Sequence, residues 1–333
     1  MKSIIEIMVL NINIFIFKLL RFIVRRISYI KKKKRVGIEL YLMDKFQLDI
    51  IKNNAVKKYL KKYNYSKEKV EKVEKVEKVE KVEKVEKVEK VEKVIIWQLW
   101  LQGWDLIPNI VKSCIKSVDY YCSGFEIIRV DESNLHEYID LPSYILEKRH
   151  KGIIPNANFS DIIRVYLLNK YGGVWIDATV LLTDYIPEKI LKSDFFKFSL
   201  SDQHKMSKYY LASNWFILSK PNHYLIESIK ESLDLYWENE NKLIDYFIFH
   251  IMFLNNFEGD DFFKTEWNKI VVLFNDKPHE LQLFLNRDFD ADKIKILIEE
   301  TFIHKMTYNL EYLDNFLNFL ETSTASVYGA ENE

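Results

Sequence analysis

Three charged side chains in the middle of the chain have a spacing that could bind an oxygen-rich ligand. Asp161 and Arg164 stand three residues apart in a segment with helical periodicity, so they share one face of the predicted helix. Asp177 directly follows the short β-prone run 174–176, where the end of a strand can hold a carboxylate at the mouth of a cleft. An ordinary intrahelical ion pair is the alternative interpretation for Asp161 and Arg164.

These residue types suit the transfer of a sugar from a nucleotide diphosphate. The departing diphosphate must be neutralised, usually by a divalent metal on carboxylate oxygens, and the sugar hydroxyls must be held. Asp177 can serve the first requirement, while Asp161 and Arg164 can bind hydroxyl and phosphate oxygens. The sequence contains no Walker loop, GxGxxG or GxSxG motif, which argues against P-loop hydrolysis, dinucleotide oxidoreduction and serine hydrolysis.

The residues around these side chains predict an α/β domain. Gly172 and Gly173 supply the left-handed backbone that ends the helix at 160–170, before the strand at 174–176. The other predicted strands lie at 94–100, 126–130, 180–182, 195–198 and 214–218, and the other predicted helices at 108–118, 134–138, 221–239 and 243–254. Such alternation is typical of a Rossmann-type, mostly parallel sheet flanked by helices.

Three sequence blocks, in this order, resemble a known family. They are IWQLWLQGWDLIPNIVKSC, SDIIRVYLLNKYGGVWIDATV and a late HKMTY. These blocks are similar to those of capsular polysaccharide synthesis proteins, and S-D-x-x-R followed by Y-G-G-x-x-x-D resembles the DXD-containing glycosyltransferases of family 32. The resemblance covers about 95–310. It implies a GT-A-like fold and a nucleotide-sugar transferase that retains the anomeric configuration.

The resemblance also implies roles for individual residues. Asp161 and Arg164 would lie near the donor sugar, and Asp177 would bind a divalent metal, Mn²⁺ or Mg²⁺. Thr179 stands where family 32 has a second aspartate, so it is the other predicted metal ligand, although a hydroxyl binds metal more weakly than a carboxylate. The further predicted donor-binding residues are Trp97, Gln98, Gly172, Gly173, His304 and Lys305.

A few other side chains are candidates for binding the acceptor or acting as a base. Asp245 and His250 lie in an aromatic-rich segment, which is more typical of a buried helix, and Asn214 precedes Trp215 in a predicted strand. Cys114 and Cys122 are the only cysteines and form no CxxC motif, so the sequence indicates neither a disulfide framework nor a cysteine zinc site. We expect Cys114 to be a small core residue in a reduced setting.

The N-terminal region is basic and amphipathic. Residues 1–60 carry 14 basic and 4 acidic side chains, whereas residues 95–333 carry 23 basic and 36 acidic ones. On a helix, segment 4–30 would place four polar residues in one stripe opposite its apolar face: Asn11, Lys18, Arg21 and Arg25. We predict a helix lying in a membrane surface; a helix packed against protein and a membrane span are the alternatives. The acidic body argues against nucleic acid as a partner.

The triplet Glu-Lys-Val is repeated nine times from Glu68 to Val94. A three-residue step walks around a helix and makes no continuous apolar stripe, so a coiled coil is excluded. Each Glu but the last has a Lys four residues later, which favours a solvated and partly helical spacer, although plain repeat expansion explains the tract equally well. The predicted organisation is therefore a membrane-associating region at 1–67, a spacer at 68–94, the catalytic domain at 95–320 and a flexible tail at 321–333.

Together these features predict a glycosyltransferase peripheral to the inner face of a bacterial plasma membrane. The donor would be a nucleotide-diphosphate sugar, and the acceptor a surface polysaccharide or lipid-linked glycan, as in capsule or lipooligosaccharide biosynthesis. Basic residues after the apolar run would keep the body cytoplasmic. One alternative is a catalytically degenerate, membrane-tethered protein that binds a nucleotide sugar or glycan. Another is an enzyme that glycosylates host or self proteins, since toxin transferases share the SDxxR and GGxxxD pattern.

Overall fold

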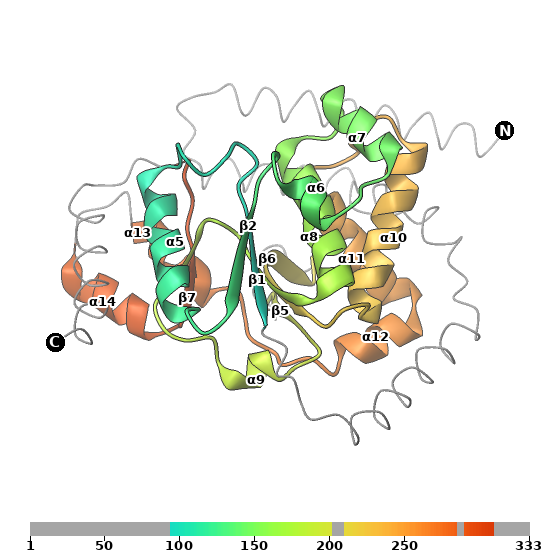
Figure 1. Ribbon diagram of the computed structural model, residues 1–333. Helices are drawn as coiled ribbons and strands as arrows, with labels where there is room; N and C mark the ends of the chain where they lie inside the picture. The colour runs from blue at the N-terminus through green and yellow to red at the C-terminus, as the bar shows by residue number, and fades with distance from the viewer. Residues whose placement is uncertain (1–93, 202–209, 285–289, 310–333) are drawn as a thin grey trace, which may run out of the picture. The chain divides into compact units, whose positions relative to one another are not determined.

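The computed structural model describes residues 94–201, 210–284 and 290–309 (Figure 1). All of them belong to one of the two compact units of the chain, Tyr63–Glu333. The predicted membrane-associating region, almost all of the spacer and the predicted tail lie outside these residues, so the domain boundaries stay predictions. Within the described ranges, no helix combines the length and apolar character needed to span a bilayer.

A five-stranded sheet forms the centre of the fold, in the order β2-β1-β3-β6-β5. Its strands are β1 (Ile95–Leu99), β2 (Glu126–Val130), β3 (Gly173–Ile176), β5 (Phe195–Ser199) and β6 (Ala212–Ser219). β1 pairs in parallel with β2 and β3, whereas β6 runs antiparallel between β3 and β5. Four of the five strands therefore point the same way, which confirms the predicted α/β class with a mostly parallel sheet flanked by helices.

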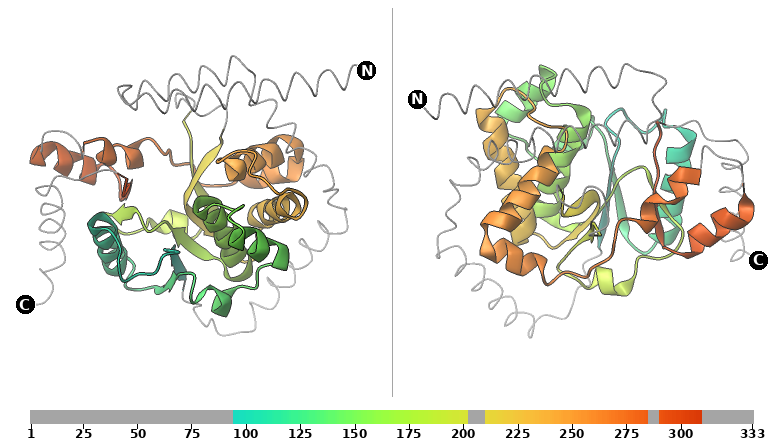
Figure 2. Two further views of the ribbon diagram at one scale, coloured as in Figure 1. Left: turned by 90° about the horizontal axis from the view of Figure 1, so that it is seen from above. Right: turned by 180° about the vertical axis from the view of Figure 1, so that it is seen from behind.

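Helices cover both faces of this sheet (Figure 1). α8 (Asn156–Tyr171) and α11 (Ile248–Gly259) pack on one face, and α10 (Tyr224–Asn239) packs against both. α5 (Asn109–Tyr121) lies on the other face, and the view from above in Figure 2 shows the sheet between the two layers. The shorter helices are α6 (Leu135–Tyr138), α7 (Ser143–His150), α9 (Glu188–Leu191), α12 (Asp261–Trp267), η1 (Lys277–His279), α13 (Leu281–Phe284) and α14 (Ala291–Glu299).

One apolar core cluster lies between the sheet and α5. It joins Ile96, Val174 and Phe216 of the sheet to Val118 of the helix and to Cys122, which follows it. Both cysteines of the chain are fully buried and free, which confirms the expectation that Cys114 is a core residue. Burial raises the pKa of each thiol to about 12, so both are poor nucleophiles at neutral pH.

Two glycines let the chain turn directly from α8 into β3. Gly172 has a φ of 67° and Gly173 a φ of 94°, in the left-handed region that side chains disfavour. A Cβ at Gly172 would lie 2.8 Å from the backbone oxygen of Ser219, and one at Gly173 would lie 2.3 Å from that of Ile95. Glycine is therefore needed at both positions so that the turn can pack against its neighbours.

A second, two-stranded sheet brings the C-terminal block to the residues after β3. It pairs β4 (Val180–Leu182) antiparallel with β7 (Ile303–Lys305), with Val180 opposite Lys305. The backbone N–H of Met306 also donates to the carbonyl of Thr179, over 2.8 Å. This pairing fixes Lys305 beside the segment that contains Asp177 and Thr179.

Two helices begin later than predicted. The helix predicted from residue 221 begins at Tyr224, because the chain first makes a turn in which Asn222 has a φ of 55°. The helix predicted from residue 243 begins at Ile248. There the Asp245 carboxylate accepts a hydrogen bond from the backbone N–H of Phe247, 2.9 Å away, and holds the chain in a turn before the helix.

Candidate active site

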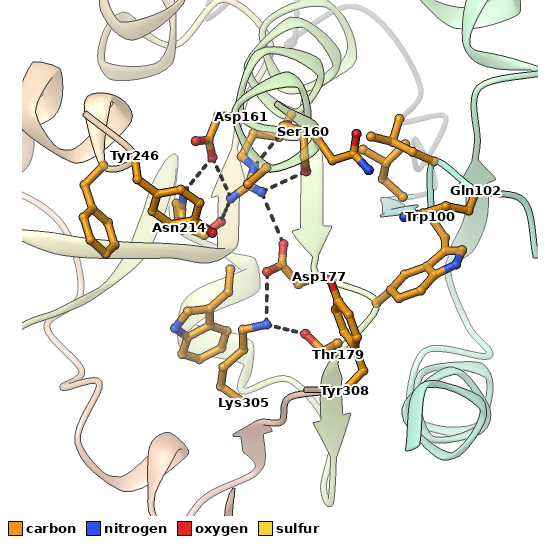
Figure 3. Close-up of a pocket in the computed structure, with 18 of the residues that line it drawn as sticks. Trp100, Gln102, Ser160, Asp161, Asp177, Thr179, Asn214, Tyr246, Lys305 and Tyr308 are labelled. Carbon is orange, nitrogen blue, oxygen red and sulfur yellow. Dashed lines mark hydrogen bonds and ion pairs between the residues drawn. The ribbon is translucent and has the colours of Figure 1, made fainter. Parts of the chain in front are cut away.

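A cavity of about 370 Å³ opens beside the carboxyl ends of β1 and β3 (Figure 3). Its wall comes from the loop after β1, the first half of α8, the residues after β3, and parts of β6, α11 and the end of β7. The polar side chains that line it include Ser160, Asp161, Arg164, Asp177, Thr179, Asn214, His250 and Lys305. Open α/β sheets commonly bind ligands at this edge, so this cavity is the candidate active site.

Arg164 links the two carboxylates of the cavity. Its Nη1 lies 3.5 Å from Asp161 Oδ1, and its Nη2 lies 3.5 Å from Asp177 Oδ1. The guanidinium also donates to Ser160 Oγ over 3.0 Å and to the backbone oxygen of Asn214, and it lies 4.9 Å from the ring centre of Trp175. Only 5% of the side chain is exposed, so Arg164 is a buried cation held from several sides.

Asp161 is the more buried carboxylate. Its Oδ1 accepts a hydrogen bond from Asn214 Nδ2 over 2.7 Å, which ties α8 to β6. Burial raises the pKa of Asp161 to about 6, Arg164 opposes this rise and the Asp177 carboxylate adds to it. Asp161 is therefore ionised at neutral pH but becomes protonated in mild acid.

Asp177 faces the open part of the cavity. Its Oδ1 accepts a hydrogen bond from Trp175 Nε1 over 2.8 Å, and its Oδ2 lies 3.2 Å from Lys305 Nζ. The same ammonium donates to Thr179 Oγ1. Asp177, Thr179 and Lys305 thus form one contiguous cluster, whose contacts Figure 3 marks with dashed lines.

The predicted metal site does not fit these donors well. Mn²⁺ and Mg²⁺ take roughly six ligands, mostly oxygens, at distances of about 2.1 Å. Asp177 Oδ1 already accepts from Trp175 and contacts Arg164, whereas Asp177 Oδ2 and the Thr179 hydroxyl both contact Lys305. Over the described ranges, no three His, Cys, Asp or Glu side chains are grouped so that they could hold a metal ion. The binding of a divalent metal by Asp177 and Thr179 stays a prediction.

The structure places the two predicted donor-binding residues of the first strand away from the cavity. Trp97 is buried, and its indole N–H donates to the Gly172 carbonyl over 2.9 Å. Gln98 is also buried, and its Oε1 accepts from Arg129 Nε over 3.2 Å. Neither side chain lines the cavity, because both lie within β1 and the chain reaches the cavity only at the end of that strand and in the loop at 100–102. Gly172 and Gly173 likewise serve the turn and do not line the cavity.

Only one of the two late residues predicted at the donor reaches the cavity. Lys305 lines it, whereas His304 is fully buried, with its Nε2 3.2 Å from Thr183 Oγ1. Adjacent side chains of a strand point to opposite faces, so β7 cannot present both to one ligand. Burial lowers the pKa of His304 to about 4, which leaves its ring neutral.

Two of the three predicted acceptor or base residues line the cavity. Asn214 holds Asp161, as described, and His250 lies on α11. His250 Nδ1 is 2.9 Å from the Ala212 carbonyl, which can only accept, so Nδ1 carries the proton and Nε2 can accept. Burial lowers the pKa of His250 to about 3, so it suits hydrogen bonding better than proton abstraction. Asp245 is buried outside the cavity.

Sequence reasoning missed the aromatic rim of the cavity. Tyr246 and Tyr308 are each about half exposed, and the rings of Trp100 and Tyr308 meet edge to face with centres 5.3 Å apart. Such rings offer an apolar face with a polar edge, which suits a sugar or a base. The aromatic content of the WLQGW and HKMTY blocks was the available signal, because both blocks supply rim residues.

A buried lysine beneath the charged residues was missed as well. Lys197 of β5 lies with its Nζ 4.4 and 4.2 Å from the ring centres of Phe249 and Phe253, and this nitrogen has no hydrogen-bond partner among the described residues. Burial, and then Arg164, lower its pKa well below the usual value. No sequence pattern marks this position, because an alternating strand with lysine in it predicts a solvent-facing residue.

The mostly parallel sheet and the charged cavity at its strand ends define an α/β protein with a polar ligand site. The chain belongs to the capsular polysaccharide synthesis protein family, whose sequence profile matches residues 44–321. The match starts well before residue 95, where the resemblance was expected to begin. No curated protein sequence matches the chain significantly.

Similar solved structures have low sequence identity to this chain and low TM-scores. The PaToxG glycosyltransferase is 11% identical with a TM-score of 0.34, and the match covers 71% of this chain and 87% of that one. A glycosyltransferase involved in the glycosylation of the major capsid of PBCV-1 is 12% identical with a TM-score of 0.32, covering 69% and 99%. The apo-form glycosyltransferase GlyE of Streptococcus pneumoniae TIGR4 is 12% identical with a TM-score of 0.38, covering 69% and 59%. Likeness at this level does not define a function.

Proposed function

We propose that this capsular polysaccharide synthesis protein is a GT-A-type glycosyltransferase that uses a nucleotide-diphosphate sugar, with a glycan or lipid-linked acceptor. The observation that carries the proposal is the convergence of Asp161, Arg164, Asp177 and Lys305 in one cavity. They come from α8, from the end of β3 and from β7, yet three successive ion pairs connect their charged groups. The resemblance to family 32 supports the same activity.

The charges in the cavity suit the two parts of such a donor. The Lys305 ammonium is reachable from the cavity and can bind diphosphate oxygens, since its side chain keeps 18% exposure. Asp161, Asn214 and the Nε2 of His250 offer acceptors and donors for sugar hydroxyls. Tyr246 and Tyr308 at the rim can pack against the apolar face of an acceptor sugar.

In the proposed reaction, the bond between the sugar C1 and the diphosphate oxygen breaks while an acceptor hydroxyl oxygen bonds to C1. The bonding electrons leave with the diphosphate, and the hydroxyl proton passes to that leaving group or to water. The charged groups of the cavity act by holding the donor and by stabilising the negative charge that grows on the diphosphate. Retention of configuration follows from the family 32 resemblance.

We further propose a location at the cytoplasmic face of the membrane. Its basis is the sequence alone, because residues 1–60 carry 14 basic and only 4 acidic side chains next to an apolar run. Such a segment binds anionic lipid surfaces, and it would place the acidic body near lipid-linked acceptors. Co-sedimentation of the full chain with vesicles containing phosphatidylglycerol, compared with phosphatidylcholine vesicles, tests this location.

The activity is tested with the full-length protein and a panel of UDP, GDP and dTDP sugars, by following release of the nucleoside diphosphate with glycan acceptors present. We expect one donor to be consumed. Asp177→Asn should slow its release by about 100-fold, because the variant keeps the shape of the side chain but loses the charge that orders Arg164 and Lys305.

Asp194→Asn is the matched control. Asp194 forms an exposed ion pair with Lys220 outside the cavity, so its turnover should equal that of the wild type. Turnover of no donor, together with binding of none, would overturn the proposal. Binding of one donor without release, at any acceptor tested, would replace the transferase with the non-catalytic, sugar-nucleotide-binding alternative.

A further inference from the structure

Lys305 lies where the resemblance places a divalent metal. The two residues predicted to hold the metal are Asp177 and Thr179, and the Lys305 ammonium contacts both: its Nζ is 3.2 Å from Asp177 Oδ2 and donates to Thr179 Oγ1. A metal bound by both oxygens would need to lie about 2.1 Å from each. It would then share the space of the ammonium, so the two cations exclude each other.

The fold holds the ammonium there through backbone contacts. Antiparallel pairing sets Lys305 opposite Val180, and the hydrogen bond from the Met306 N–H to the Thr179 carbonyl continues the pairing beyond the strand. Because side chains alternate along β7, this register directs Lys305 to the cavity while His304 faces the core. A register fixed by backbone bonds makes the position of Lys305 a built feature of the site.

The charge around Asp177 is already balanced by protein groups. Arg164 contacts one of its oxygens and Lys305 the other, while Arg164 also pairs with Asp161. Two carboxylates therefore meet two cations in the cavity. A divalent ion placed between Asp177 and Thr179 would face two positive groups, and Lys305 already engages both the carboxylate oxygen and the hydroxyl that would bind it.

The ammonium also has the capacity to bind a phosphate. It carries three N–H donors, and its contacts to Asp177 and Thr179 among the described residues use two of them. Its side chain is more exposed than that of Arg164, which also lines the cavity, so Lys305 is the more accessible of these two cations to a ligand.

We infer that Lys305 takes the place of a divalent metal in this protein, so that its ammonium, fixed by Asp177 and Thr179, neutralises the donor diphosphate and transfer needs no divalent cation. This inference rests on the proposed glycosyltransferase function. When the bond from C1 to the diphosphate oxygen breaks, its electron pair stays on that oxygen, and the Lys305 ammonium stabilises the added charge. The ammonium keeps its proton throughout, so no further acid or base is consumed.

The test measures nucleoside diphosphate affinity and metal binding on the full-length protein. Calorimetric titrations with UDP, GDP and dTDP are run once in EDTA and once in Mn²⁺, for the wild type, Lys305→Met, Lys305→Arg and Lys293→Met. Lys293 serves as the control because it is an exposed lysine in an ion pair with Asp290, 2.8 Å long, outside the cavity. Electron paramagnetic resonance of free Mn²⁺ measures metal binding directly.

We expect one nucleotide to bind the wild type equally well in EDTA and in Mn²⁺. Lys305→Met should weaken this binding at least about tenfold, Lys305→Arg should restore most of it, and Lys293→Met should change nothing. The free Mn²⁺ signal should fall no further with protein and nucleotide than with nucleotide alone. Thermal melting shows whether Lys305→Met is folded. If it is not, the nucleotide affinity of Lys305→Arg and the Mn²⁺ titration of the wild type test the inference.

Three results would overturn the inference while leaving the proposed function in place. They are nucleotide binding that requires Mn²⁺, unchanged affinity in a folded Lys305→Met variant, and uptake of Mn²⁺ by the protein. If no nucleotide binds under either condition, the proposed function itself fails, and the inference fails with it.

Discussion

α8 contributes charged or polar residues to two clusters. The contrast between them shows how a cluster that binds a ligand differs from one that only joins two helices. One is the pocket cluster of Asp161, Arg164, Asp177 and Lys305, which comes from α8, the end of β3 and β7. The other is the helix cluster, in which Tyr166 of α8 donates to Asp234 of α10 over 2.6 Å and Lys230 pairs with the same carboxylate over 2.8 Å.

The two clusters use similar groups in different ways. In the helix cluster, Lys230 and Asp234 are one turn apart on a single helix and keep 24% and 20% exposure, so water and local geometry satisfy them. In the pocket cluster, Arg164 is 5% exposed and its partners come from separate elements around a cavity. Long-range convergence of buried charge beside an open cavity is costly to build for stability alone, which is why we assign function to the pocket cluster.

Replacement of one cation in each cluster should give the largest difference in stability and activity between the two clusters. Arg164→Met leaves Asp161 buried without its cation, so we expect a loss of about 3–5 kcal/mol in the free energy of unfolding and of at least about 1000-fold in sugar transfer. Lys230→Met should cost about 1 kcal/mol and leave transfer unchanged. Urea denaturation and donor turnover, measured on both variants, check this. Equal losses of transfer activity in the two variants would contradict the assignment of function to the pocket cluster alone.

The next effect concerns the pH dependence of the pocket cluster. Since the pKa of Asp161 is raised to about 6, the carboxylate takes up a proton below that pH and no longer pairs with Arg164, so transfer should fall about tenfold per pH unit below about 6. Stability should move the other way. Between the unfolded pKa of 3.8 and about 6, the folded chain binds more protons than the unfolded chain, so this group stabilises the fold as the pH falls.

Asp161→Asn separates this effect from other titrations. The amide cannot titrate, so the variant should lose both the acidic decline in activity and this contribution to the pH dependence of stability, with a lower activity at pH 7. Donor turnover and urea denaturation from pH 4.5 to 7.5 supply both curves. An acidic decline that persists unchanged in the variant would assign it to another group.

Local sequence rules predicted the part of the pocket cluster that depends on local structure. A spacing of three on a helix placed Asp161 beside Arg164, and the end of a β-prone run placed Asp177 at the cavity. The same kind of reasoning did not reveal that Trp97 and Gln98 lie away from the cavity, because the buried strand β1 uses both side chains for packing and the cavity begins at its end.

Strand register decided what the sequence could not. His304 and Lys305 are adjacent, and no local pattern tells which one faces the ligand until β7 is paired with β4. The contact between Lys305 and Thr179 spans 126 residues of sequence, so its effect on the metal prediction was equally hidden. Lys197 shows the same limit, because its burial depends on helix α11 packing over β5.

The smallest expected effect is that of a substitution in the helix cluster, at Tyr166 of α8. Tyr166→Phe removes the hydroxyl that donates to Asp234 and leaves the ring, which lies 4.3 Å from Lys230 Nζ, so we expect a loss of about 1.5 kcal/mol in the free energy of unfolding. Transfer and nucleotide affinity should not change, because Tyr166 does not line the cavity. Urea denaturation and donor turnover, measured on this variant, check both expectations. A fall in transfer at full folding would mean that the helix cluster acts on the site through α8, and the two clusters would then be one functional unit.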